Sequence, residues 1–284
     1  MIDSESIRKF VAVAEELNFG RAAERLGMAQ PPLSRAVQRL ERRLGVQLFD
    51  RGGRRIALTP AGEVLLREGR AVLTSLEAAQ RRTQRAGQAD PRLVLVTKPG
   101  GDAGLLDPVL ARYAEHPDAV EVDVVICGIG EQVGMLRAGE ADAALLRTPH
   151  DDPAGFATQE LLTEREVVVL RRDHRLAGRA SVTMADLAGE TFPRWSEDDP
   201  ATGPLIHDTG QVTQLVALGR TVAVLPESAR LHLRRDLVTV PVLDGSLITL
   251  LLAWPEDSRS RALAALVRTA TEVASGTRLS DVGA

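Results

Sequence analysis

The sequence predicts a multi-domain protein of the α/β class, with a helical N-terminal part and a longer part in which strands and helices alternate. Its 284 residues and 44% hydrophobic content are enough for more than one core. Before Pro91, apolar residues recur at intervals of three and four, which is helical spacing. From Pro91 onward, β-prone runs such as RLVLV alternate with amphipathic segments, a pattern typical of mostly parallel sheets.

Charge is distributed unevenly between these two parts. The whole chain has a formal net charge of −4, which by itself argues against a nucleic-acid partner. Residues 1–87, however, contain 16 Lys and Arg against 10 Asp and Glu, whereas the remainder contains 19 against 29. A basic module joined to an acidic body indicates an anionic partner for the N-terminal part only.

Several classes of protein do not fit the sequence. The single cysteine, Cys127, excludes an intramolecular disulfide framework. No apolar run reaches membrane-spanning length, and the first residues, MIDSESIRKF, do not resemble a secretion signal. There is no nucleophile elbow, phosphate-binding glycine loop or metal motif. We therefore expect a cytoplasmic protein that is not an enzyme and that has no metal, no cofactor and no membrane partner.

The N-terminal part contains a predicted helix-turn-helix. A helix over 4–16 is followed by a short helix in FGRAAERLG, and then by MAQPPLSRAVQRLERRLG. Pro31 and Pro32 suit the first turn of a helix, and Gly45 suits its end. The second helix of such a motif fits the major groove of DNA, where Gln30, Ser34 and Arg35 approach base edges. Arg39, Arg42 and Arg43 suit phosphates, which position the protein without specifying sequence.

Two further elements complete this part. The segment VQLFDRGGRRIALT predicts a hairpin tipped by Gly52 and Gly53, whose arginines suit the minor groove or its phosphates. Thr59 then caps a long helix that begins at Pro60 and reaches about residue 87. Its sparse apolar residues recur near heptad spacing, which favours packing against a second copy of the chain.

The stretch FVAVAEELNFGRAAERLGMAQPPLSRAVQRLERRLGVQLFDRGGRRIALTPAGEVLL resembles the LysR-type transcriptional regulators almost position by position. The C-terminal part is similar to the family more loosely, in LLDPVLARYAEHPDAVEVDV, GEADAALLR, ELLTEREVVVLRRDHRLA and TVAVLPES. The resemblance implies a winged helix-turn-helix over 1–59 and a dimerising linker helix over 60–90. An effector-binding domain over 91–284 would resemble periplasmic binding proteins, with subdomain I at about 91–163 and 255–276 and subdomain II at about 164–254.

The resemblance also implies partners: promoter DNA, further copies of the chain in a dimer or tetramer, a small-molecule effector, and RNA polymerase if the protein is an activator. The residues predicted to contact DNA are Arg21, Gln30, Pro31, Pro32, Ser34, Arg35, Gln38, Arg39, Arg42, Arg43, Arg51, Arg54 and Arg55. Those predicted to border the effector cleft are Thr97, Lys98, Gly100, Gly101, Thr148, Arg194, Trp195 and Thr202.

Two segments of the predicted cleft depart from the family pattern or carry chemistry of their own. TKPGGDAG follows a strand, and its glycines and Lys98 suggest an anion seat at a helix N-terminus, fitting an effector with a carboxylate. Between residues 192 and 211 the chain is shorter than in other family members by about a helix and a strand, elements that supply one wall of the cleft.

That shortening leaves two alternatives to control by a ligand. In the first alternative, the protein is an architectural DNA-binding protein that needs no ligand. In the second, it is a regulator controlled by a protein partner that covers an apolar patch around 192–211. Hinge candidates are 164–170 and 247–254. Cys127 is interpreted as a core thiol, and Asp142 as a structural turn residue.

Overall fold

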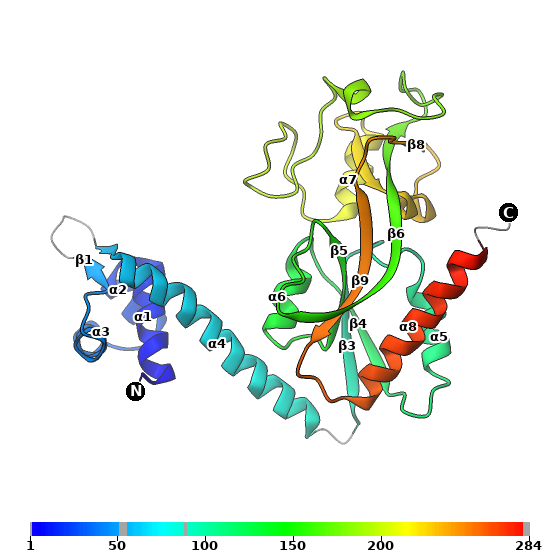
Figure 1. Cartoon of the computed structure of the whole chain (residues 1–284). Helices are drawn as coiled ribbons and strands as arrows, with labels where there is room; N and C mark the ends of the chain where they lie inside the picture. The colour runs from blue at the N-terminus through cyan, green and yellow to red at the C-terminus, as the bar shows by residue number, and fades with distance from the viewer. Residues whose placement is uncertain (1, 51–55, 88–89, 281–284) are drawn as a thin grey trace. The chain divides into compact units, whose positions relative to one another are not determined.

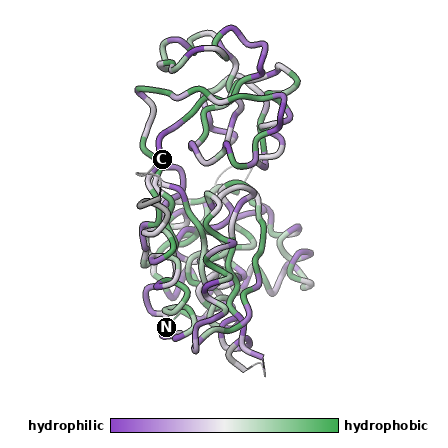
Figure 2. Tube along the Cα trace, turned by 90° about the vertical axis from the view of Figure 1, so that its right-hand side faces the viewer, coloured by the Kyte–Doolittle hydropathy of each residue, from purple (hydrophilic) through white to green (hydrophobic). Residues whose placement is uncertain are grey.

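The computed structural model describes residues 2–50, 56–87 and 90–280, and the chain divides into two compact units, 1–84 and 85–284. Figure 1 labels the helices and strands of both units. Within the described residues, no helix combines the length and apolar content needed to cross a membrane. Figure 2 agrees with this, because hydrophobic and hydrophilic residues alternate along the trace.

The first unit is built on three helices: α1 (Ser4–Glu16), α2 (Phe19–Arg25) and α3 (Gln30–Leu44). Side-chain caps start the first two, because Asp3 accepts a hydrogen bond from the Ser6 amide at 2.8 Å and Asn18 accepts from the amide of Gly20. The core of this unit is aromatic at its centre, where the ring of Phe49 lies 5.4 Å from that of Phe10. Helices α1 and α2, together with Phe49, therefore pack against the inner side of α3.

Helix α3 begins and ends where the sequence predicts. Pro31 and Pro32 lie in its first turn, and Gly45 terminates it with φ of 73°, a conformation that costs glycine little. Beyond it, β1 (Phe49–Asp50) and β2 (Ala57–Leu58) pair antiparallel, as a hairpin requires. Helix α4 (Pro60–Ala86) follows, and the Thr59 hydroxyl accepts from the Gly62 amide at 3.0 Å, the predicted cap.

The second unit contains a sheet of seven strands in the order β4-β3-β5-β9-β6-β7, with β8 also paired to β6. Its strands are β3 (Arg92–Thr97), β4 (Glu121–Ile126), β5 (Ala143–Thr148), β6 (Phe156–Arg171), β7 (Ala223–Pro226), β8 (Leu237–Pro241) and β9 (Leu247–Pro255). Parallel pairing of β3 with β4 and β5 gives the α/β character that the alternating pattern predicts. Its helices are α5 (Leu106–Tyr113), α6 (Glu131–Arg137), α7 (Thr209–Ala217) and α8 (Arg261–Ser280), with short 3-10 helices η1 (Met184–Leu187) and η2 (Glu227–His232).

Strand β6 divides this unit into two lobes by changing partners along its length. Its first part, as far as Arg165, pairs with β9, and from Glu166 onward it pairs with β7 and β8. We call the part containing β3, β4, β5 and β9 the first lobe, and the part containing β7 and β8 the second. In Figure 1, β6 and β9 run side by side between the lobes.

The lobe boundary differs from the sequence interpretation at one point. Subdomain II was expected to extend to about residue 254, but β9 pairs with β5 from Thr249 to Ala253 and so belongs to the sheet of the first lobe. Strand β6 is also continuous through residue 164, where a new subdomain was expected. The partner change at Glu166 explains this, because one strand serves two sheets without a break.

Helices cover both faces of the first lobe's sheet. Helices α5 and α8 pack on one face around Tyr113 and Leu266, and α6 packs on the other around Leu136 and Leu146. In the second lobe, α7 packs on the sheet through Val212 and Val216. Each lobe therefore has a hydrophobic core of its own, and side chains at the boundary between the lobes are not needed to form either core.

Candidate functional site

The first candidate site is the outer face of α3. Leu33, Val37 and Leu40 are buried against the other helices, which leaves the opposite face of α3 to solvent. Pro32, Ser34 and Gln38 are half-buried there, and the residues fully exposed are Gln30, Pro31, Arg35, Arg39, Arg42 and Arg43. One helix therefore presents four arginines and two amide side chains on one exposed surface.

Two of the predicted DNA contacts have acidic partners within the unit. Arg43 Nη1 lies 3.2 Å from Asp3 Oδ2, and Arg21 Nε lies 3.2 Å from Glu16 Oε2. Within the described part of the chain, Arg35, Arg39 and Arg42 form no ion pair. Among the predicted DNA contacts that the structure describes, these three are the arginines most available to an external anion. Arg51, Arg54 and Arg55 lie outside the described residues.

A buried carboxylate ties α3 to the hairpin. Glu41 is only 4% exposed, and its Oε1 accepts the amides of Leu48 at 2.9 Å and Phe49 at 3.3 Å. Charge-assisted bonds of this kind are stronger than neutral ones. Glu41 therefore sets the position of β1 relative to the exposed face of α3, a role that a helical pattern in the sequence does not reveal.

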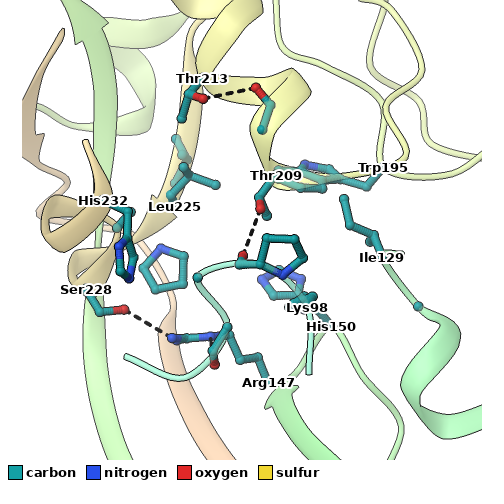
Figure 3. A pocket seen from close by; sticks show the side chains of 18 of the residues that line it. Lys98, Ile129, Arg147, His150, Trp195, Thr209, Thr213, Leu225, Ser228 and His232 are labelled. Carbon is teal, nitrogen blue, oxygen red and sulfur yellow. Dashed lines mark hydrogen bonds between the residues drawn. The ribbon is translucent and has the colours of Figure 1, made fainter. Parts of the chain in front are cut away.

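The second candidate site is a cavity of about 820 Å³ between the two lobes of the second unit. Figure 3 shows side chains from both lobes converging on it. The first lobe contributes Lys98, Gly101, Ile129, Arg147, His150 and Asp151, among others. The second contributes Trp195, Asp199, Thr209, Leu225, Ser228 and His232, among others. Its size is that of a small-molecule site.

The floor of this cavity is a buried polar network centred on Arg147, at the end of β5. Arg147 pairs with Glu164 of β6 at 2.5 Å, and its Nη2 donates to Ser228 Oγ at 3.1 Å. Its Nε donates to the Gly101 carbonyl at 3.3 Å. Glu164 in turn accepts the Ser228 amide, so a single ion pair joins the first lobe, the crossing strand and the second lobe.

The turn after β3 forms one wall. Lys98 Nζ lies 3.4 Å from Asp151 Oδ2, which also accepts the Arg147 amide at 2.7 Å. Gly101 is tightly enclosed, because an added Cβ would lie 2.9 Å from the Lys98 carbonyl oxygen. The Gly101 amide donates to that same carbonyl, and α5 begins only at Leu106. The cavity thus meets this turn, and not the helix N-terminus on which the predicted anion seat depended.

The segment 192–211 supplies the opposite wall despite its shortness. Asp199 accepts the amides of Trp195 and Ala201, both at 2.9 Å, which folds the segment into a turn and presents Trp195 to the cavity. These backbone hydrogen bonds lower the pKa of the Asp199 carboxyl. Among residues 192–211, all of which the structure describes, Trp195 is the one exposed large hydrophobic residue.

The predicted effector residues divide into two groups. Lys98, Gly100, Gly101 and Trp195 line the cavity, whereas the lining of the described cavity does not include Thr97, Thr148, Arg194 or Thr202. Thr97 is buried behind the turn, and Thr148 pairs with Thr249 in the sheet. Arg194 points back to the Gly203 carbonyl at 3.1 Å, and Thr202 is exposed. The sequence analysis did not predict five further lining residues: Arg147, His150, Asp151, Ser228 and His232. For Arg147 the sequence does hold a signal, because a charged residue at the end of an apolar strand is unusual.

Two hydrogen bonds join the lobes next to the cavity. The Thr209 hydroxyl donates to the Pro99 carbonyl at 2.8 Å, as Figure 3 shows, and the Ile129 amide donates to the His207 carbonyl at 3.2 Å. Since one partner of each bond lies in each lobe, opening the lobes breaks both. In this structure the two lobes are therefore joined by direct hydrogen bonds.

Comparisons with known proteins identify the same two regions. Residues 4–63 match the model of the bacterial regulatory helix-turn-helix protein, lysR family, and residues 86–211 match the LysR substrate binding domain. The chain belongs to the LysR family of transcriptional regulators. It is therefore a DNA-binding transcriptional regulator, and the family expected from the sequence is confirmed.

Individual relatives extend the similarity over the whole chain. The HTH-type transcriptional regulator IlvR of Caulobacter vibrioides is 32% identical, covering 95% of this chain and 98% of its own. YnfL of Escherichia coli, an uncharacterized HTH-type transcriptional regulator, is 30% identical over 90% of this chain and 93% of its own. The structure of CbnR with its target DNA is 20% identical, with a TM-score of 0.61 over 96% of this chain and 100% of that one. Full-length BenM is 25% identical, with a TM-score of 0.55 over 98% of both chains. This similarity confirms the predicted fold class.

Proposed function

We propose that this LysR-family regulator is controlled by a small molecule that binds between the lobes of its second unit. The observation that carries the proposal is the cavity of about 820 Å³, whose lining comes from both lobes and includes Arg147, the partner of Glu164. A ligand that contacts both lobes stabilises one degree of closure over another. Only such differential affinity shifts a conformational equilibrium.

We propose the outer face of α3 as the reader of DNA sequence. Gln30, Ser34 and Arg35, near its N-terminal end, are assigned to base edges, because residues at that end enter deepest into the major groove. Arg39, Arg42 and Arg43 are assigned to phosphates, as is the flanking Arg21. Pro31, Pro32 and Gln38 complete the surface, and Arg51, Arg54 and Arg55 are assigned to the wing.

Self-association is part of the same proposal. Val64, Val72 and Leu76 are exposed on α4, as expected of a helix that packs against a second copy. A two-fold symmetric dimer binds half-sites related by the same axis, so the operator is expected to be partly palindromic. Two such dimers form the proposed tetramer, and RNA polymerase is a partner if the protein activates.

The structure bears differently on the two alternatives. A wall formed by Trp195 and Asp199 means that the shortened segment still encloses a cavity, which favours ligand control over a purely architectural role. The alternative of a protein partner depended on an apolar patch around 192–211. In that segment the exposed large hydrophobic residue is Trp195, which lines the cavity.

The test uses the full chain and DNA selected from a random pool by the protein itself. The footprint is measured with and without a panel of metabolites. Ligand control predicts that at least one compound changes the footprint, and that Ala229→Trp, which fills the cavity, abolishes the change while ligand-free binding persists. Leu218→Trp, at an exposed position outside the cavity, is the matched control. A footprint that no compound changes would favour the architectural alternative.

A further inference from the structure

The basic side chains in the cavity are already neutralised by the protein. Lys98 pairs with Asp151, and Arg147 pairs with Glu164. These charges are strongly shielded from water, because the four side chains are 12%, 4%, 4% and 7% exposed, respectively. An anion that approached either cation would also meet a carboxylate a few ångströms away. Neither cation is therefore a free seat for a carboxylate ligand.

The remaining charge in the lining is negative. Asp199 accepts amides from its own turn, and these bonds, together with a smaller contribution from Arg194, lower the pKa of its carboxyl. Two cations and two carboxylates line the described cavity, and Glu164 adds a third carboxylate directly behind Arg147. The lining also includes the Ser196 hydroxyl and the imidazoles of His150 and His232, and a neutral imidazole offers both a donor and an acceptor nitrogen. The field within the cavity thus opposes an anionic ligand.

The apolar part of the lining includes the indole ring of Trp195. Aromatic residues make up only 3% of the chain, yet Trp195 faces the cavity with 37% of its surface exposed. In Figure 3, Ile129 lies close to Trp195, and Leu225 faces them across the cavity. A flat ring between such side chains stacks on the indole and buries apolar surface. The Asp199 carboxylate, held against the Trp195 amide, provides an acceptor for a donor on that ring.

We propose that the effector is a flat, uncharged aromatic or heteroaromatic compound with an N–H donor, stacked on Trp195 with its donor directed to Asp199. This inference rests on the proposed function, because it names the ligand class of the same cavity. It replaces the carboxylate ligand expected from TKPGG, because in the folded chain Lys98 is paired.

The test compares ligands of equal shape that differ in charge. Binding of benzamide and benzoate, and of indole and indole-3-carboxylate, is measured by calorimetry on the full chain. We expect the uncharged member of each pair to bind about tenfold more tightly, a difference of roughly 1.4 kcal/mol. Trp195→Ala is expected to abolish binding of benzamide and indole, whereas Leu218→Ala, at an exposed position of the same lobe, leaves binding unchanged.

A second variant tests the electrostatic argument. Asp151→Asn removes the partner of Lys98, and it is expected to raise the affinity for benzoate at least about fivefold relative to benzamide. Thermal unfolding of each variant verifies that it folds. If Asp151→Asn does not fold, the comparison of charged and uncharged ligands on the wild-type chain still tests the inference.

The outcomes separate this inference from the proposed function. Tighter binding of the carboxylates by the wild-type chain overturns the ligand class but leaves ligand control intact. If neither member of either pair binds, the ligand class is also overturned, and the metabolite panel with footprinting decides on ligand control. Binding of benzamide that survives Trp195→Ala places the ligand elsewhere and overturns the inference.

Discussion

Arg147 and Glu164 form a buried ion pair, at 2.5 Å, at the point where strand β6 passes from one lobe to the other. Glu164 also accepts the amide and the hydroxyl of Ser228, the latter at 3.0 Å, so that both carboxylate oxygens are used. Such a pair is costly to desolvate and is maintained only when its hydrogen bonds are complete. The pair lies close to the point where β6 changes its strand partners, so it joins residues of both lobes.

Replacing one member of this pair should destabilise the second unit strongly. Glu164→Gln leaves the Arg147 guanidinium buried without a counter-charge, and we expect a loss of about 3 kcal/mol in the free energy of unfolding. Urea unfolding followed by circular dichroism measures this loss. The matched control is Glu272→Gln, which removes the exposed partner of Arg112 and should cost less than about 1 kcal/mol. Equal effects of the two substitutions would contradict the structural role of the buried pair.

Glu41 should prove essential to the hairpin of the first unit. Glu41→Ala leaves the amides of Leu48 and Phe49 without their buried acceptor, and an unsatisfied buried group costs roughly 1–3 kcal/mol. We expect unfolding of the first unit at lower temperature and weaker binding to DNA of any sequence. Glu24→Ala, at an exposed position of α2, is the comparison. An unchanged melting temperature for Glu41→Ala would show that the hairpin is held by other contacts.

Arg35 and Arg43 should differ in their contribution to DNA recognition. Arg35→Ala is expected to cost roughly 1–3 kcal/mol on the selected site and to relax base preference, as removal of a base contact does. Arg43→Ala should weaken binding to all sequences alike and reduce the slope of affinity against salt. Because Arg43 already pairs with Asp3, its effect should be the smaller of the two. Fluorescence anisotropy on selected and random DNA at several salt concentrations distinguishes the two variants. If Arg35→Ala also weakened binding to both DNAs equally, this division of roles would be refuted.

Local signals predicted the first unit well, whereas the cavity depended on long-range contacts. The limits of α3 follow from Pro31 and Gly45, because a proline in the first turn and a glycine at the end act within a few residues. The network around Arg147 joins residues 17 and 81 positions apart, and no periodicity in a sequence encodes such pairing. For the same reason, Lys98 was expected to seat an anion until the fold placed Asp151 beside it.

The segment 192–211 illustrates the same limit. Arg194 and Trp195 are neighbours in the chain, but only Trp195 faces the cavity, because the turn held by Asp199 directs Arg194 to the Gly203 carbonyl. Their separation depends on backbone hydrogen bonds between residues 192–206, which the sequence alone does not specify. The family resemblance located this wall of the cleft, and the fold decided which side chains form it.

The Cys127 thiol should react slowly. Partial burial, with a smaller contribution from the Glu131 carboxylate, raises its pKa to about 11, whereas an ordinary thiol ionises near about 8.5. At pH 8 the folded chain should therefore react with iodoacetamide on the order of a hundredfold more slowly than the chain unfolded in urea. A raised pKa favours the protonated thiol in the folded state, so the stability it contributes is complete below the unfolded value and declines as the pH rises toward 11. Mass spectrometry of alkylation against pH measures the profile, with Glu131→Gln expected to shift its midpoint slightly downward. Rapid alkylation of the folded protein at pH 7 would instead indicate a reactive thiolate and contradict the interpretation of Cys127 as a core thiol.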